Sequence, residues 1–225
     1  ARSRKPAEVV GVDLTPEFVD CATQLSDLVG LTSKQGISFH QGNALDLSFS
    51  DATFDLACMV HVGMNISDKA ALFREARRVL RPGGILAVYD VMLETPQSAN
   101  SKPNGQQLFS QGSEKISNTY ADIPLRFPVP WASSPSQSFV CAPQDYELHA
   151  TKAGFAPAHV SCHRGAYARA FFKPLKAAMA AGRAPPPLSL SLTMGPDAGQ
   201  KMRNVIDLLE AGTIAPWEML WRLAL

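Results

Sequence analysis

Val9-Val10-Gly11-Val12-Asp13-Leu14-Thr15-Pro16 and Ile37-Ser38-Phe39-His40-Gln41-Gly42-Asn43-Ala44-Leu45-Asp46 are short apolar runs that each end in polar residues. The chain between them is predicted to be one helix, with Thr15 as N-cap and Gly30 as its stop. This is a strand-helix-strand unit with Asp13 at its first strand tip. Open parallel sheets bind ligands beyond the carboxyl ends of their strands, where an acidic residue can accept hydrogen bonds from both ribose hydroxyls of an adenosine. The stretch therefore predicts a binder of a nucleoside cofactor.

The helix of this first unit has an apolar stripe. Phe18, Ala22, Leu25 and Val29 recur at helical spacing, so we expect that stripe to pack on the sheet.

A second unit follows the first along the chain. Thr53–Val60 is a nearly continuous apolar run, as expected of a strand covered on both faces. An amphipathic helix is predicted from an N-cap at Ser67 to about Leu80, and Arg81-Pro82-Gly83-Gly84 then turns the chain into another apolar strand, Ile85–Met92. Alternating strands and helices predict an α/β fold of the Rossmann-like, doubly wound kind, with a mostly parallel sheet.

The second half of the chain has a different texture. Residues 95–142 are rich in Pro, Ser, Gln and Asn, which predicts a lid or substrate-binding insertion because structureless loops of that length are unusual. Pro143–Lys152 is predicted to be a helix closed by Gly154. Phe155–Ser161 and Ala166–Phe172 are predicted to form a terminal antiparallel hairpin, with His163 and Arg164 solvated in its turn. The expected division is a cofactor-binding core at 1–94, the lid at 95–142, the helix and hairpin at 143–172, and a helical tail at 173–225.

Composition narrows the class of partner. The 21 basic and 20 acidic residues give a net charge of +1, so nothing suggests nucleic acid or an anionic membrane as partner. No run is long and apolar enough to span a bilayer, and the basic start is not followed by the apolar run that a signal peptide requires. The four cysteines lack C-x-x-C spacing, which favours reduced thiols packed in the core over disulfides or zinc. These features favour a cytoplasmic protein with a small-molecule partner, and they leave the oligomeric state open.

One expected feature is missing near the amino terminus. A glycine-rich turn normally precedes the strand-tip acidic residue by about 20 positions. Asp13 lies too close to Ala1 for such a turn. We therefore expect the sequence to begin partway through a fold, without its first strand.

Several ordered motifs together resemble the class I S-adenosylmethionine-dependent methyltransferases of the small-molecule type, close to the ubiquinone and menaquinone C-methyltransferases. The motifs are Gly11-Val12-Asp13-Leu14-Thr15-Pro16, Gln41-Gly42-Asn43-Ala44, Leu47-Ser48-Phe49, Phe54-Asp55-Leu56 and Arg77-Arg78-Val79-Leu80-Arg81-Pro82-Gly83-Gly84. The resemblance covers roughly Val9 to Met92. It implies S-adenosylmethionine as cofactor and a fold whose missing first strand lies between the strands ending at Asp13 and Val60.

The resemblance also implies roles for single residues. Asp13 would hold the ribose hydroxyls and Leu14 would pack on the adenine. Asn43 stands where the family usually has Asp, and its amide oxygen can still accept a bond from the adenine amino group; Ala44 would offer its backbone N–H to the ring. Val60 and His61 would lie beside the methionine part of the cofactor.

The acceptor side is less defined by the sequence. Methyl transfer from a sulfonium mainly requires alignment and exclusion of water, so no metal or obligatory acid is expected. If the acceptor is an amine or hydroxyl, His61, Tyr120 or His149 can take its proton. Asn65, Tyr120 and Trp131 are candidates for substrate contacts. Structural roles remain open alternatives: a helix cap for Asp13, a turn for Asn43, and a pin between lid and core for Trp131.

Three function classes remain. The first is a methyltransferase that moves a methyl group to an N, O or C atom of a small metabolite. The second is a truncated, non-catalytic methyltransferase-like protein, which the absent glycine turn supports. The third is a nicotinamide-dependent oxidoreductase, against which the Gly-Asn-Ala and Arg-Pro-Gly-Gly pieces count, because the nicotinamide fingerprint has no place for them.

Overall fold

The computed structural model describes residues 8–31, 33–94, 106–107, 125–159, 161–184, 186, 189 and 191–225. The first half alternates strands and helices: β1 (Val9–Asp13), α1 (Pro16–Leu28), β2 (Ile37–Gln41), β3 (Phe54–Val60), α2 (Lys69–Val79) and β4 (Leu80–Leu93). The second half contains β5 (Gln106–Gln107), α4 (Pro143–Lys152), β6 (Phe155–Pro157), β7 (Ser161–His163), α5 (Gly165–Ala180), α6 (Ser191–Met194), α7 (Ala198–Glu210) and β8 (Ile214–Leu223). Short 3-10 helices are η1 (Ser33–Gln35), η2 (Gly63–Asn65) and η4 (Pro135–Gln137).

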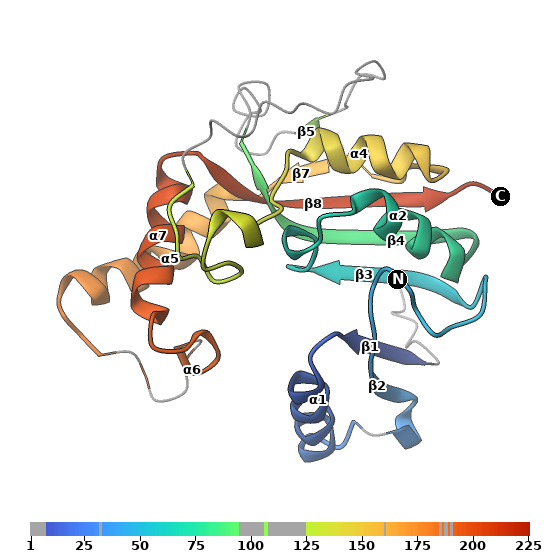
Figure 1. The fold of residues 1–225 in the computed structure, drawn as a ribbon, viewed down its shortest axis with the longest axis horizontal. Coiled ribbons are helices and arrows are strands. Elements are labelled where there is room, and N and C mark those ends of the chain that lie inside the picture. The colour runs from blue at the N-terminus through green and yellow to red at the C-terminus, as the bar shows by residue number, and fades with distance from the viewer. Residues whose placement is uncertain are drawn as a thin grey trace.

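The strands form two sheets. β1 and β2 make a parallel pair, and the larger sheet has the order β3-β4-β8-β7-β5, with β6 also paired to β8. β3 and β4 are parallel, whereas β8 runs antiparallel to β4, β6 and β7. β3, β4, β6 and β7 therefore share one direction (Figure 1). The predicted α/β fold with a mostly parallel sheet is confirmed, and its antiparallel strands are β5 and β8 rather than a terminal hairpin.

The helix boundaries of the first half follow local chemistry. α1 starts at Pro16 after the N-cap Thr15, and Gly30 at φ +73° ends it, as predicted. The N-cap of α2 is Asp68 rather than the predicted Ser67, because the Asp68 carboxylate accepts the Ala71 N–H at 2.8 Å. A carboxylate in that position satisfies one of the donors that a helix start leaves unpaired.

Two predictions for the second half are wrong. Ala166–Phe172 belongs to helix α5 rather than to a hairpin strand, because Ala168 and Phe172 turn one helical face toward the core cluster of the α5–α7 region. Residues 214–223 of the predicted helical tail form strand β8. Trp217, Met219 and Trp221 alternate on its buried face, and this period of two is typical of a strand. α4, followed by Gly154 at φ +91°, agrees with the sequence, and α7 lies within the predicted helical tail.

The core lies in two clusters around β4 and β8. One cluster joins these strands to α2 and α4 and contains Phe73, Tyr146, Trp217 and Trp221. The other joins the end of β4 to α5 and α7 through Leu93, Ala168, Leu208 and Ile214. The second cluster fixes α5 and α7 beyond the carboxyl ends of β3 and β4, at the left of Figure 1.

The first strand-helix-strand unit is packed far less well than the rest. α1 has no buried residue, and Phe18, Leu25 and Val29 of the stripe expected against the sheet are 53%, 58% and 70% exposed. β3, expected to be covered on both faces, exposes Leu56, Cys58 and Val60. Among the described strands, β1 pairs only with β2 and β3 only with β4. No described segment therefore covers the apolar side chains between them.

The cysteines differ from the expectation of core packing. None forms a disulfide, but Cys21 and Cys58 are exposed, because α1 and β3 are not covered by a described neighbour. Within the described ranges, no helix is long and apolar enough to cross a membrane.

Candidate functional site

Four of the predicted cofactor residues lie together at the carboxyl ends of β1 and β2. The Gly42 N–H donates to the Asp13 carbonyl at 2.9 Å, and Gln41 Nε2 donates to the Leu14 carbonyl at 3.2 Å. A Cβ on Gly42 would lie 2.9 Å from Val12 Cγ1, so glycine lets the two strand tips approach closely. This places Asp13 and Leu14 beside the segment that carries Asn43 and Ala44.

The Asp13 carboxylate serves the local turn as well as facing solvent. Its Oδ1 accepts the Thr15 N–H at 2.8 Å, which is the structural role that the sequence left open for this residue. The Thr15 side chain makes no capping bond. No hydrogen bond or ion pair involves Oδ2 within the described part of the chain, and the residue is exposed. One carboxylate oxygen is therefore available to a ligand.

Asn43 also has a turn role. Its Oδ1 accepts the Leu45 N–H at 2.9 Å, and its carbonyl accepts the Asp46 N–H at 3.0 Å. The Ala44 N–H makes no hydrogen bond with any described residue. An amide oxygen has two lone pairs, so Asn43 can hold this turn and still accept a bond from a ligand.

The tip of β3 carries the second group. Val60 is 53% exposed, and His61 follows it with φ +54°, a conformation uncommon for residues other than glycine. The His61 N–H donates to the Tyr89 carbonyl at 2.8 Å, and the two rings meet edge to face at 5.2 Å. Partial burial of the His61 ring lowers its pKa and so favours the neutral imidazole, which can accept a proton.

The predicted acceptor-side residues do not form one cluster. Asn65 is exposed on η2, close in sequence to His61. Trp131 donates from Nε1 to Ser138 Oγ at 3.0 Å and packs against the core cluster of α5 and α7, which is the pin role. His149 stacks on Phe73 between α4 and α2, so it lies inside a helix pair rather than at the strand tips. Tyr120 lies outside the described residues.

Asp90 is a buried carboxylate that the sequence analysis missed. It is 0% exposed near the end of β4, where its Oδ2 accepts the Tyr146 hydroxyl at 2.7 Å and its Oδ1 accepts the Val91 N–H at 3.0 Å. Burial raises its pKa to about 6, against the hydrogen bonds from Tyr146, Val91 and Gly63. The signal was present, because a single carboxylate in an apolar strand is a candidate for a perturbed pKa.

Lys69 links the two loops next to Asp90. Its ammonium, on a residue 6% exposed, donates to the Ile66 carbonyl at 2.5 Å and to the Phe139 carbonyl at 2.9 Å. It also lies 5.8 Å from the centre of the Tyr146 ring, and burial lowers its pKa. The lysine therefore ties the loop after β3 to the chain that precedes α4.

His163 and Arg164 are not the solvated turn residues that the sequence predicted. His163 Nε2 lies 2.6 Å from Glu94 Oε1, with side-chain exposures of 15% and 9%. Arg164 pairs with Glu218 at 2.6 Å. The turn is absent because β7 pairs with β8 and leads directly into α5, so these side chains lie against the end of the sheet.

One group of polar residues therefore lies at the carboxyl ends of β1 and β2, and another at the carboxyl end of β3. Among the described strands, β1 and β3 each have one edge without a partner. One group has the acceptors and donors that an adenosine needs, and the other places a neutral imidazole at the tip of the neighbouring sheet. No hydrogen bond between the groups occurs among the described residues. Such a division suits a ligand with a nucleoside at one end and a reacting centre at the other.

Residues 1–88 match the protein family described as "Methyltransferase domain". Two curated proteins are similar to part of the chain. Erythromycin 3''-O-methyltransferase of Saccharopolyspora erythraea is 36% identical over 90 residues, covering 40% of this chain and 29% of the relative. Demethylmenaquinone methyltransferase of Deinococcus radiodurans is 36% identical over 100 residues, covering 44% of this chain and 38% of the relative. The aligned region thus spans less than two fifths of either relative.

A solved structure extends the likeness to nearly all of the chain. Phosphoethanolamine N-methyltransferase 2 of Haemonchus contortus, in complex with S-adenosyl-L-methionine, superposes with a TM-score of 0.66 at 12% identity. The match covers 97% of this chain and 44% of that one. At this identity the likeness establishes the fold.

Proposed function

We propose that this chain, which belongs to the class I S-adenosylmethionine-dependent methyltransferases, transfers a methyl group to an N, O or C atom of a small metabolite. The observation that carries the proposal is the convergence of Asp13, Leu14, Asn43 and Ala44 at the carboxyl ends of β1 and β2. In this proposal residues 1–94 bind the cofactor, and the insertion at 95–142 and the tail at 173–225 shape the acceptor site. The four cysteines without a disulfide support a reducing, cytoplasmic location.

The adenosine half of the cofactor fits the residues present. Asp13 keeps a carboxylate oxygen for the ribose hydroxyls, and Leu14, 67% exposed, offers an apolar surface for the base. Ala44 offers an uncommitted N–H and Asn43 a second lone pair. These groups supply the kinds of acceptor and donor that an adenosine requires, while the turn hydrogen bonds of Asp13 and Asn43 stay in place.

The chemistry asks little more of the protein. S-adenosylmethionine, when bound, supplies a methyl group on a sulfonium that is open to in-line attack. The protein has to align the acceptor and exclude water. Neutral His61 is positioned at the β3 tip to take a proton from an amine or hydroxyl acceptor.

The methionine half has fewer contacts in this sequence. No Gly-x-Gly occurs among the 225 residues, and such a turn normally brings backbone N–H groups to the ligand. We therefore expect S-adenosylhomocysteine to bind this chain weakly.

Calorimetric titration of S-adenosylhomocysteine tests the proposal. We expect saturable binding well above 1 μM in Kd, abolished by Asp13→Ala and unchanged by Asp20→Ala, an exposed carboxylate on α1. Loss of binding in both variants would contradict a specific role for Asp13. A Kd near 1 μM would establish a complete cofactor site and support the enzyme. It would contradict the expectation that this chain lacks contacts to the methionine part of the cofactor.

A second candidate is a non-catalytic relative of these enzymes. The exposed apolar side chains of β3 and α1 and the lack of a Gly-x-Gly turn favour it. Absence of any heat at millimolar S-adenosylhomocysteine, with the chain folded, would select this candidate over the enzyme.

A further inference from the structure

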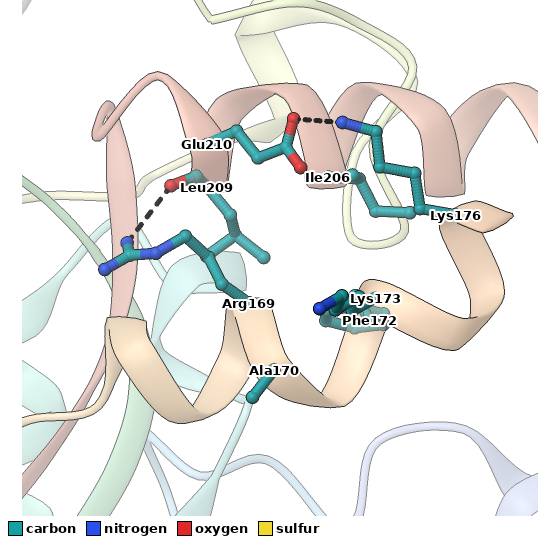
Figure 2. A pocket seen from close by; sticks show the side chains of 8 residues that line it. All are labelled: Arg169, Ala170, Phe172, Lys173, Lys176, Ile206, Leu209 and Glu210. Carbon is teal, nitrogen blue, oxygen red and sulfur yellow. Dashed lines mark hydrogen bonds and ion pairs between the residues drawn. The ribbon is translucent and has the colours of Figure 1, made fainter.

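A pocket of about 430 Å³ lies between α5 and α7. Its walls are two helices, and the residues that line it are Arg169, Ala170, Phe172, Lys173, Lys176, Ile206, Leu209 and Glu210. Figure 2 shows Arg169 and Lys176 of α5 reaching across to Leu209 and Glu210 of α7. The volume is in the range of roughly 300–1,000 Å³ that small-molecule sites occupy.

The floor of the pocket is apolar. Ile206 and Leu209 are 5% and 3% exposed and belong to the inner face of α7. Phe172 of α5 packs against the core cluster of α5 and α7, to which Leu209 belongs. An apolar group of a ligand would cover the part of these side chains that remains exposed, chiefly on the half-buried Phe172.

The rim of the pocket is cationic. Arg169, Lys173 and Lys176 are spaced by four and three residues on α5, so they share one helix face. Like charges at this spacing repel one another, and an anion between them would remove that repulsion.

The pairing of the lining charges leaves a net positive charge. Lys176 pairs with Glu210 at 2.5 Å, the only acidic residue in the lining. Arg169 donates from Nη1 to the Leu209 carbonyl at 3.4 Å, which engages one of the five donors of a guanidinium. Lys173 makes no hydrogen bond or ion pair within the described ranges. Arg169 and Lys173 are therefore available to an oxyanion.

We propose that the α5–α7 pocket binds a small amphipathic anion, with a phosphate or carboxylate head held by Lys173 and Arg169 and an apolar body on Phe172, Ile206 and Leu209. Charge-assisted hydrogen bonds to an oxyanion are the strongest contacts that such side chains make. The site lies beyond the carboxyl ends of β3 and β4 but shares no residue with the cofactor candidates. It therefore goes beyond the proposed function and does not depend on it.

Calorimetric titration of decyl phosphate, below its micelle concentration, into the 225-residue chain tests the proposal. We expect saturable binding that Lys173→Ala weakens by about tenfold or more. Ala170→Phe, which enlarges a side chain of the pocket lining and keeps every charge, should weaken it as well. Lys152→Ala, on an exposed lysine at the end of α4, is the matched control and should change the affinity less than about twofold.

Three outcomes would overturn the proposal. One is decyl phosphate binding that neither pocket variant alters, and another is equal binding of decyltrimethylammonium. The third is co-sedimentation with phosphatidylglycerol vesicles without binding of decyl phosphate, which would identify a membrane surface instead of a soluble ligand. The titration contains no S-adenosylhomocysteine, so its result is separate from the test of the cofactor site.

Discussion

The β1–α1–β2 unit and the sheet around β8 show opposite degrees of burial within one chain. Leu28 of α1 is 81% exposed, whereas Trp217 and Met219 of β8 are 0% exposed. Both regions have regular apolar patterns, of helical period in α1 and of strand period in β8. The difference teaches that an apolar pattern specifies which face an element will bury, and that a neighbour is still needed to bury it.

Trp221→Ala should have the largest effect on stability. Trp221 is 1% exposed, meets Phe73 edge to face, and donates from Nε1 to Glu147 Oε2 at 2.8 Å. Its removal leaves a cavity and an unpaired acceptor, so we expect a loss of about 3–5 kcal/mol. Urea denaturation measures it. Trp131→Ala, at a partly buried site, should cost clearly less, and equal losses would contradict the contrast in packing.

The buried carboxyl of Asp90 should make the stability of the protein depend on pH. Its folded pKa, about 6, lies above the unfolded value, so the folded state binds more protons between pH 4 and 6. The contribution of protonated Asp90 to stability is complete below about pH 4 and is lost as pH rises through 6. The free energy of unfolding should change by roughly 2–3 kcal/mol over this range. Denaturation of wild type and Asp90→Asn at pH 4 and 7 isolates it. An unchanged difference between the two proteins would refute the raised pKa.

Gly63→Ala tests how tightly the well-packed region is filled near the β3 tip. A Cβ there would meet Tyr146 Oη and lie 2.5 Å from Asp90 Oδ2. Overpacking of this kind should cost about 1–3 kcal/mol. Gly199→Ala on α7, whose Cβ would be 3.7 Å from Arg203 Nη1, should be neutral or gain about 0.5 kcal/mol. Thermal unfolding measures the melting temperature of both variants. Similar shifts in the two would contradict the close packing around Gly63.

Leu28→Ala should have the smallest effect. The side chain has no buried contacts, so we expect a change within about 0.5 kcal/mol. The matched variant Leu72→Ala, on α2 and 6% exposed, should cost about 2–5 kcal/mol. A large loss for Leu28→Ala in urea denaturation would mean that α1 is covered in solution.

The sequence predicted elements better than it predicted their neighbours. Pro16, Gly30, Pro143 and Gly154 marked helix ends because their backbone preferences act locally. β8 was missed because its alternating pattern followed a predicted helix and its partners lie far back in the chain.

In the candidate site, too, the sequence predicted the positions of residues along the chain better than their contacts. Asp13 and Asn43 could be located at strand tips from spacing alone, whereas their turn hydrogen bonds depend on the local backbone. Asp90 could have been singled out as a lone carboxylate in an apolar strand, but its partner Tyr146 on α4 and the Glu94–His163 pair were not predicted, because contacts between distant elements define them. Tertiary contacts of this kind leave only a weak signal in one sequence.

The position of β8 has a consequence for synthesis on the ribosome. It follows every other described element in the chain, yet it lies between β4 and β7, and Arg222 reaches back across 139 positions to the Gly83 carbonyl. At about 5–20 residues per second, β4 would wait on the order of ten seconds with an open edge. A nascent chain held in that interval presents an unpaired apolar strand, which is the kind of surface that chaperones protect from aggregation.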